Sequence, residues 1–114
     1  MLLAALASVV IASCYDGDTC TTTTGERVRL ACIDTPELVG KRAEPVPAGA
    51  ARDYLRDLVV SKTVGIRRIT KDRYGRTVAE LFIGKMNIQE EMVATGYAGI
   101  YRSYDYQCPW TEGQ

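Results

Sequence analysis

The sequence predicts a mainly β domain in which a five-stranded barrel carries two to three packed helices. Five short runs are rich in β-branched and apolar residues, and two further stretches place apolar residues at helical spacing. The first helical stretch lies between the third and fourth strand-like runs. The length of 114 residues fits one domain. A composition of 46% hydrophobic and 25% charged residues excludes an intrinsically disordered chain.

The predicted strands are short and separated by turn residues. Valine, isoleucine and threonine dominate them, as is typical of half-buried strands. Asp16-Gly17 separates the first two strands, Gly25 ends the second, and residues 72–75 form the turn between the last two. The strands cover residues 8–14, 19–24, 27–33, 63–69 and 77–83.

The two predicted helices cover residues 50–60 and 87–95, each with leucine, isoleucine or valine recurring on one face. Residues 38–49 are polar and include Pro45, Pro47 and Gly49, so they predict a loop. Three strands, a helix, two strands and a second helix follow the order of an oligonucleotide-binding (OB) barrel.

The first ten residues are almost wholly apolar, but they lack a basic start and are too short to span a membrane. We expect residues 1–7 to be a leader remnant and residues 8–114 to form the domain. This assignment predicts an extracellular or periplasmic location and no stable membrane association.

The chain contains no histidine, which excludes a histidine general base and histidine-ligated zinc. Its four cysteines (Cys14, Cys20, Cys32 and Cys108) include no C-x-x-C pair, which argues against a zinc ribbon. Either they form two disulfides, with three pairings available, or those in the strand-like runs are core thiols. Fourteen basic residues balance fourteen acidic ones, which argues against binding nucleic acid through bulk charge but leaves a local basic cleft open.

Residues 16–19 read Asp-Gly-Asp-Thr. A reverse turn whose aspartates cap backbone amides explains this motif by itself. The functional alternative is that Asp18 points inward as a hard oxygen ligand for calcium.

Residues 34–37 read Asp-Thr-Pro-Glu, and Arg29 precedes them on the same predicted strand. A helix start explains this motif too, although a loop rather than an apolar periodic run follows it. In a regular strand Arg29 and Asp34 face opposite sides, unless the strand twists or bulges between them.

Residues 72–76 read Asp-Arg-Tyr-Gly-Arg, a hairpin turn within a basic stretch. Exposed, solvated arginines are the simplest interpretation. The basic surplus around a tyrosine also suits phosphate binding combined with base stacking.

Taken in order, the three motifs resemble those of the staphylococcal nuclease (thermonuclease) family, and the resemblance covers residues 8–104. It implies an OB-fold barrel and a phosphodiesterase that cuts DNA and RNA with one Ca²⁺ ion. By position, Asp18 and Asp34 would bind calcium through carboxylates and Thr35 through its carbonyl. The expected cut is on the 5′-oxygen side and leaves 3′-phosphate ends.

The resemblance also implies roles for the remaining motif residues. Glu37 takes the general-base position, and Arg29 and Arg76 take the two phosphate-clamping positions, where paired hydrogen bonds favour arginine over lysine. Arg73 and Tyr74 fall where the family contacts the terminal phosphate and the base. Single-stranded DNA and RNA are the expected substrates, and we expect a monomer.

Two features depart from the family pattern. Residues 108–110 resemble the approach to a final packed helix, but the chain ends at residue 114, and the net charge is zero instead of strongly basic. A non-catalytic OB-fold module that binds single-stranded nucleic acid or protein is the main alternative, and a calcium-stabilised structural domain is a third. The complete set of motif residues favours the enzyme.

Overall fold

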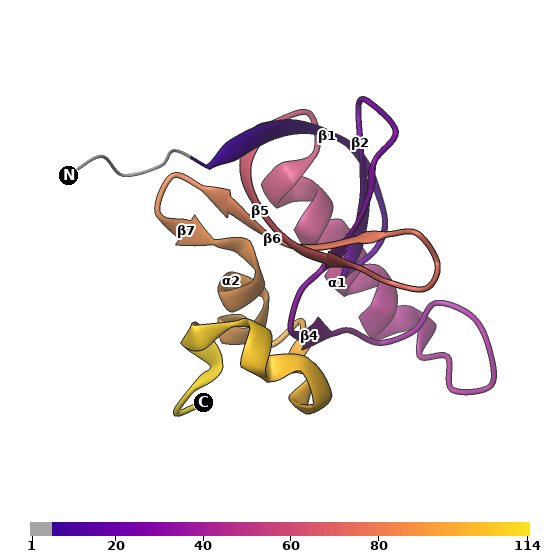
Figure 1. Ribbon diagram of the computed structural model, residues 1–114. Coiled ribbons are helices and arrows are strands. Elements are labelled where there is room, and N and C mark those ends of the chain that lie inside the picture. The colour runs from indigo at the N-terminus through magenta and orange to yellow at the C-terminus, as the bar shows by residue number, and fades with distance from the viewer. Residues whose placement is uncertain (1–5) are drawn as a thin grey trace.

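Five strands close into a barrel in the computed structural model, which describes residues 6–114 (Figure 1). Antiparallel pairing gives the order β3-β2-β1-β5-β6, and parallel pairing of β3 with β6 closes the sheet on itself. This closed mixed barrel confirms the predicted OB-type topology. The strands are β1 (Ala7–Asp16), β2 (Thr19–Thr22), β3 (Arg27–Leu30), β5 (Thr63–Lys71) and β6 (Thr77–Ile83).

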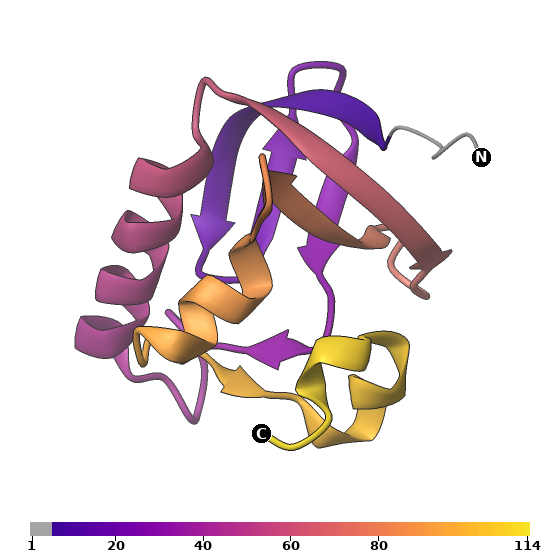
Figure 2. The same ribbon diagram turned by 90° about the vertical axis from the view of Figure 1, so that its left-hand side faces the viewer.

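Two α-helices pack beside the barrel, as Figure 2 shows. The first, α1 (Pro45–Val59), buries Ala51, Leu55 and Val59 in the core. It begins five residues earlier than predicted, so part of the expected loop is helical. Pro45 and Pro47 occupy its first turn, where a missing N–H costs no hydrogen bond. The second helix, α2 (Ile88–Ala94), lies within the predicted range 87–95.

The predicted strand 27–33 is wrong in one respect, because it breaks after Leu30. Cys32 adopts a positive φ of 69°, and the chain then leaves the barrel to form β4 (Ile33–Asp34). This short strand pairs with β8 (Gly99–Ile100), and another short strand, β7 (Met86–Asn87), extends the sheet beyond β6. The break turns the residues after Leu30 away from the barrel axis and toward the C-terminal segment.

The C-terminal segment folds as two 3₁₀ helices, η1 (Arg102–Gln107) and η2 (Pro109–Thr111). Of residues 108–110, which resemble the approach to a helix, Pro109 and Trp110 open η2, and Cys108 lies between the two 3₁₀ helices. Figures 1 and 2 place this yellow segment beneath the barrel, close to the point where the chain enters β4.

All four cysteines are paired, which settles the alternatives that the sequence leaves open. Cys14 and Cys20 are bonded across the β1–β2 pair, and Cys32 is bonded to Cys108. All four side chains are almost fully buried, so the disulfides belong to the core.

The expected leader, residues 1–7, lies largely outside the described residues. Of these seven, Ala7 opens β1 and pairs with Ile66 of β5. Within residues 6–114, no helix has both the length and the apolar character that crossing a bilayer requires.

Candidate active site

The turn between β1 and β2 carries two aspartates that are tied together. The backbone N–H of Asp18 donates to Asp16 Oδ1 at 3.1 Å, and Thr19 Oγ1 donates to Asp18 Oδ1 at 3.2 Å. Gly17 between them is buried, and a Cβ there would stand 2.8 Å from the Cβ of Ala51 in α1 and 2.9 Å from Cγ2 of Thr35. A glycine is therefore required for the turn to press against the helix and the Asp34-Thr35 segment.

Asp18 binds the second motif directly. The backbone N–H and the Oγ1 of Thr35 both donate to Asp18 Oδ2, at 3.2 and 3.1 Å. Asp18 is only 7% exposed. These two hydrogen bonds bring Asp18 and Asp34, which are sixteen positions apart in the printed sequence, to the same side of the barrel.

The carboxylates of this site repel one another. Burial, followed by the charge of Asp18 and a hydrogen bond with it, raises the pKa of Asp16 to about 6. Burial and repulsion by Asp18 also raise the pKa of Asp34, with Glu37 adding to the repulsion and Arg29 opposing it. Burial is the larger cause for both residues and repulsion between the carboxylates adds to it, so a bound cation would favour their charged forms.

Arg29 joins the carboxylates to the barrel. Its Nη1 donates to the carbonyl of Leu30 at 2.8 Å and lies 3.4 Å from Asp18 Oδ2, while its Nη2 donates to the carbonyl of Ile33 at 2.9 Å. The break after Leu30 explains how Arg29 and Asp34 reach the same site. A guanidinium has five N–H groups, so donors remain for a phosphate after the two carbonyls are satisfied.

Glu37 lies in the exposed loop that follows β4, and none of the side-chain hydrogen bonds within residues 6–114 involves its carboxylate. Its backbone carbonyl accepts from the N–H of Glu44 at 2.9 Å, which folds the loop back toward the start of α1. Its charge acts on Asp34, so the carboxylate lies beside the acidic cluster with its oxygens free for solvent.

The third motif forms the β5–β6 hairpin turn. Asp72 Oδ1 accepts from the backbone N–H groups of Tyr74 and Arg76, and Asp72 Oδ2 accepts from Arg76 Nε at 2.7 Å. Partial burial pushes the pKa of Asp72 upward, but these hydrogen bonds outweigh it and hold the pKa below its usual value. Arg76 is therefore held through Nε, and its two terminal nitrogens make no hydrogen bond within residues 6–114.

Arg73 and Tyr74 stand at the tip of this hairpin. Arg73 Nη2 donates to the Tyr74 hydroxyl at 2.9 Å, and the guanidinium carbons of Arg73 and Arg76 lie 5.0 and 5.5 Å from the centre of the Tyr74 ring. Such distances are those of cation–π contacts. Both Arg73 and Tyr74 are exposed, so they are available to a ligand.

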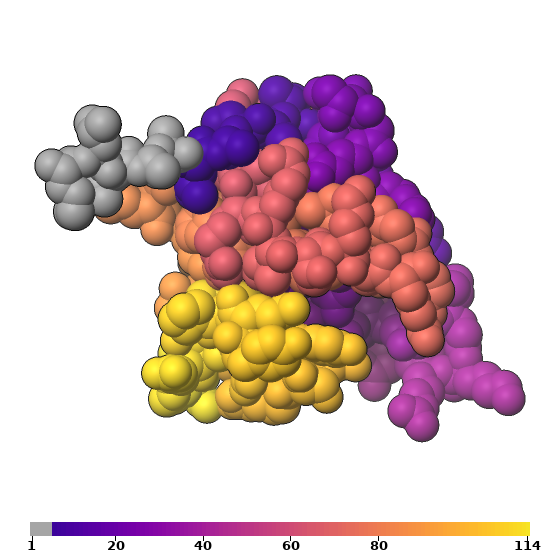
Figure 3. Space-filling view, viewed as in Figure 1, coloured from indigo at the N-terminus to yellow at the C-terminus, as the bar shows by residue number. Residues whose placement is uncertain are grey.

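A cleft of about 570 Å³ joins Arg29 to the hairpin arginines. Its floor comes from the β3–β4 segment, one wall from the hairpin, and the other wall from the C-terminal segment through Tyr101, Tyr104 and Gln107. Figure 3 shows the hollow between the hairpin and the yellow C-terminal segment. Arg29 both contacts Asp18 and lines the cleft, so it connects the acidic cluster to a groove with basic and aromatic walls.

Two arginines of the basic stretch around the hairpin form ion pairs with glutamates of the barrel, whereas the sequence suggested solvated or phosphate-binding side chains. Arg67 forms an ion pair with the buried Glu80, and Arg68 forms a paired contact with Glu26 at 2.8 and 2.7 Å. Hydrogen bonding by Arg68 is the main reason that the pKa of Glu26 falls to about 2. The cations left facing the cleft are Arg29, Lys71, Arg73 and Arg76.

The donor set fits a hard cation. Within residues 6–114, no three cysteine, aspartate or glutamate side chains converge closely enough to form a complete metal site by themselves. Asp18 and Asp34 supply two carboxylates beside the Thr35 backbone, and repulsion by Asp18 adds to burial in raising the pKa values of Asp16 and Asp34. Calcium commonly completes such a set with carbonyl oxygens and water.

Sequence reasoning missed Asp16, Tyr101 and Tyr104 as members of the site. Asp16 stands two residues before Asp18 in the same motif, and the aromatic enrichment of residues 97–104 is visible in the sequence. Neither signal shows that the side chains reach the cleft. That information depends on how the C-terminal segment folds.

Comparison with known proteins identifies relatives of this chain. Residues 27–112 match the family described as staphylococcal nuclease homologues. An uncharacterized endonuclease of Haemophilus influenzae is 38% identical over 103 residues, which cover 87% of this chain and 55% of that protein. The staphylococcal-like nuclease CAN1 of Arabidopsis thaliana is 36% identical over 80 residues, covering 69% of this chain and 23% of the relative.

A third relative is endonuclease Htp3 of Saprolegnia parasitica, 32% identical over 87 residues that cover 71% of this chain and 41% of that protein. The chain therefore spans about half or less of the length of these relatives. The matched residues include the β3–β4 segment and the β5–β6 hairpin, which carry most of the site.

Proposed function

Because the chain belongs to the staphylococcal nuclease family, we propose that it is a calcium-dependent nuclease that hydrolyses phosphodiester bonds of single-stranded DNA and RNA. One observation carries the proposal. Arg29 contacts the Asp18 carboxylate at 3.4 Å and lines the same cleft as Arg76, so a phosphate in the cleft would meet both arginines beside the acidic cluster.

Asp18 and Asp34 would hold the ion through their carboxylates and Thr35 through its backbone carbonyl. When bound, calcium supplies positive charge that stabilises the phosphate oxygens as negative charge builds on them. Thr35 has a second task, since its N–H and hydroxyl fix the orientation of Asp18.

Arg29 and Arg76 would both bind the phosphate, and different groups hold each guanidinium in place. Arg76 is anchored through Nε by Asp72, which leaves both terminal nitrogens for non-bridging oxygens. Arg29 is anchored by the carbonyls of Leu30 and Ile33. Donors fixed before the substrate arrives stabilise a transition state without reorganisation, and losing one typically costs on the order of 3 kcal/mol.

Glu37 would orient a water molecule and accept its proton as the oxygen attacks phosphorus. The bond from phosphorus to the 5′ oxygen then breaks, and the products carry a 3′-phosphate and a 5′-hydroxyl. The free carboxylate of Glu37 beside Asp34 supports this role, because a general base needs unoccupied oxygens.

The test is cleavage of a labelled single-stranded oligonucleotide and its RNA counterpart by the purified protein. Cleavage should require Ca²⁺ and stop with EGTA, and mass spectrometry should find 3′-phosphate ends. Glu37→Gln should lower kcat at least a hundredfold. Glu44→Gln is the matched control, since Glu44 lies in the same exposed loop and its side chain makes no capping hydrogen bond. Binding without cleavage in any divalent cation would instead support a nucleic-acid-binding module.

The compartment and the oligomeric state are part of the proposal. Two buried disulfides support an oxidising location, extracellular or periplasmic, because such bonds persist there and are rare in the cytosol. We also propose that the chain acts as a monomer, since both walls of the cleft come from one chain.

A further inference from the structure

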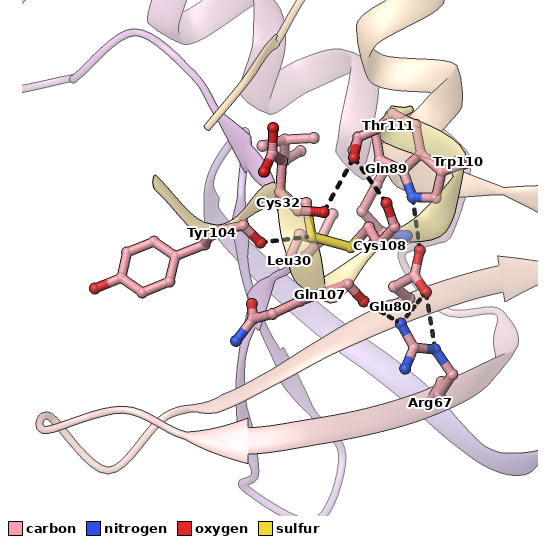
Figure 4. Close-up of a disulfide and its surroundings, with 12 residues drawn as sticks. Leu30, Cys32, Arg67, Glu80, Gln89, Tyr104, Gln107, Cys108, Trp110 and Thr111 are labelled. Atoms are coloured by element: carbon pink, nitrogen blue, oxygen red, sulfur yellow. Dashed lines mark hydrogen bonds and ion pairs between the residues drawn. A yellow bond between two sulfur atoms is a disulfide. The ribbon is translucent and has the colours of Figure 1, made fainter. Parts of the chain in front are cut away.

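The Cys32–Cys108 disulfide joins the floor of the cleft to its C-terminal wall (Figure 4). Cys32 lies in the break between β3 and β4 and lines the cleft, and Cys108 lies between η1 and η2. The two residues are 76 positions apart, and both are buried. This bond is the covalent connection between two segments that each carry cleft residues.

The Cys32 segment holds Arg29 in place. Leu30 and Ile33, on either side of the break, supply the two carbonyls that accept from the Arg29 guanidinium. Cys32 itself has a φ of 69°, a left-handed conformation that non-glycine residues rarely adopt without support. The conformation that orients Arg29 is therefore one that the segment needs external contacts to keep.

The Cys108 segment supplies those contacts and the aromatic wall. The N–H of Tyr101 donates to the carbonyl of Cys32 at 2.8 Å. The Cys32 sulfur lies 3.5 Å from the carbonyl oxygen of Tyr104, a packing contact because a disulfide sulfur carries no hydrogen. Of residues 101–114, only Cys108 and Thr111 are buried, so little apolar surface holds this segment down.

Few polar contacts fasten the segment to the barrel. Trp110 Nε1 donates to Glu80 at 2.8 Å, and Arg67 Nη2 donates to the carbonyl of Gln107 at 2.9 Å, as Figure 4 shows. Segments with little buried apolar area open most readily. Without the disulfide, the wall would depend on these contacts and on the short pairing of β4 with β8.

We propose that the Cys32–Cys108 disulfide is a positioning element of the cleft, and that its reduction switches the protein from a state that binds and cleaves single-stranded nucleic acid to one that does so poorly. The cleavage part rests on the proposed function. A dithiol supplies two electrons and two protons to the disulfide, which becomes two thiols, and the dithiol closes to its own disulfide. The segment is then free to leave, and Arg29 loses its fixed acceptors.

The second disulfide provides a matched control. In Cys14→Ala/Cys20→Ala only Cys32–Cys108 can respond to dithiothreitol, and in Cys32→Ala/Cys108→Ala only Cys14–Cys20 can. Reduction of the first variant should lower kcat/KM for an oligonucleotide at least tenfold, and reoxidation should restore it. The second variant should show the lowered kcat/KM from the start and no further response.

Trp110 is the one tryptophan of the sequence and packs against the Ala31, Cys32 and Cys108 cluster, so its fluorescence reports on docking of the segment. Reduction should change this emission and leave the far-UV circular dichroism of the barrel intact. Because Cys32 lines the cleft, a saturating oligonucleotide in EGTA should slow reduction by dithiothreitol. Loss of the far-UV signal on reduction would show a purely structural disulfide and overturn the proposal.

The positioning of Arg29 has its own test. If the disulfide acts through Arg29, reduction should lower the kcat/KM of the Arg29→Lys variant by a much smaller factor than that of the wild type, because the two effects are coupled. An equal loss of kcat/KM in the two proteins would contradict the proposal. So would an unchanged kcat/KM after a thiol assay has confirmed that the disulfide is reduced to two free thiols. If the oxidised protein does not cleave, the proposed nuclease function fails separately. The positioning role of the disulfide is then tested by oligonucleotide affinity, which reduction should weaken at least tenfold. An affinity that reduction leaves unchanged would contradict the proposal.

Discussion

Gly17 offers a test of how tightly the first motif is packed. In Gly17→Ala, the new Cβ would stand 2.8 Å from Ala51 Cβ and 2.9 Å from Thr35 Cγ2, distances that side-chain atoms do not tolerate without movement. Gly17 has no left-handed φ, so alanine would otherwise stabilise the protein by about 0.4–1 kcal/mol by restricting the unfolded chain. Overpacking a close-packed site costs about 1–3 kcal/mol. The steric cost is larger, and we expect a net loss of about 1–2 kcal/mol.

The assay is thermal and urea denaturation of Gly17→Ala beside Gly49→Ala. Gly49 lies within α1, where an added Cβ would meet only the end of the Arg52 side chain at 3.7 Å, so the control should gain about 0.5–1 kcal/mol. A stabilised Gly17→Ala, or two variants of the same sign, would refute the steric reasoning.

A double-mutant cycle locates the clash. Ala51→Gly removes the nearer methyl group, so Gly17→Ala should cost less in that background than in the wild type, by at least about 0.5 kcal/mol. The clash with Thr35 should persist in that background. It should also disturb Asp18, because Thr35 holds Asp18 through two hydrogen bonds. We therefore expect Gly17→Ala to weaken calcium binding in titration calorimetry. Strict additivity with Ala51→Gly would mean that the turn moves away from the helix freely.

Three further predictions follow from the site and its surroundings. Arg76→Lys should lower kcat/KM at least tenfold, because lysine lacks the planar guanidinium that can donate paired hydrogen bonds to a phosphate while Nε holds Asp72, and Arg52→Lys on α1 should leave it unchanged. Calcium should raise the Tm of the wild type but not of Asp34→Asn; equal rises in both would place the ion elsewhere. The lowered pKa of Glu26, about 2 against 4.5 unfolded, gives stability that is full above pH 4.5 and lost as the pH falls toward 2. Glu26→Gln should remove this contribution, so the loss in the free energy of unfolding between pH 7 and pH 3, measured by urea denaturation, should be smaller than in the wild type by about 1 kcal/mol. An equal loss in the two proteins would contradict the prediction.

The strand order and the helices were predictable because their signals are local. Alternation and β-branching place strands within a few residues, and β6 has the predicted bounds of 77 and 83. The start of α1 was missed because Pro45 and Pro47 indicate a loop unless they fall in a first helical turn. That distinction depends on where the helix docks, since the apolar contacts of α1 with the barrel stabilise a helix that its first residues alone would not.

The cysteine pairing was not predictable, although its solution is simple once the topology is known. Cys14 and Cys20 become direct partners in the β1–β2 register, which leaves Cys32 to meet Cys108. The sequence contains the spacing of the first pair but not the register, because a bulge between Cys14 and Asp16 shifts the hairpin. The second pair depends on the fold of the whole chain.

The break after Leu30 determines most of what sequence reasoning could not place. A regular strand through residues 27–33 would set Arg29 and Asp34 on opposite faces and give the cleft no floor. The left-handed residue at position 32 redirects the chain, so that the carbonyls of Leu30 and Ile33 converge on Arg29 and Asp34 comes beside Asp18. Cysteine has no intrinsic preference for that conformation, so nothing local in the sequence marks the break. Cys32 is bonded to Cys108 and its carbonyl accepts from the N–H of Tyr101, so the contacts made at the break come from a segment near the other end of the chain.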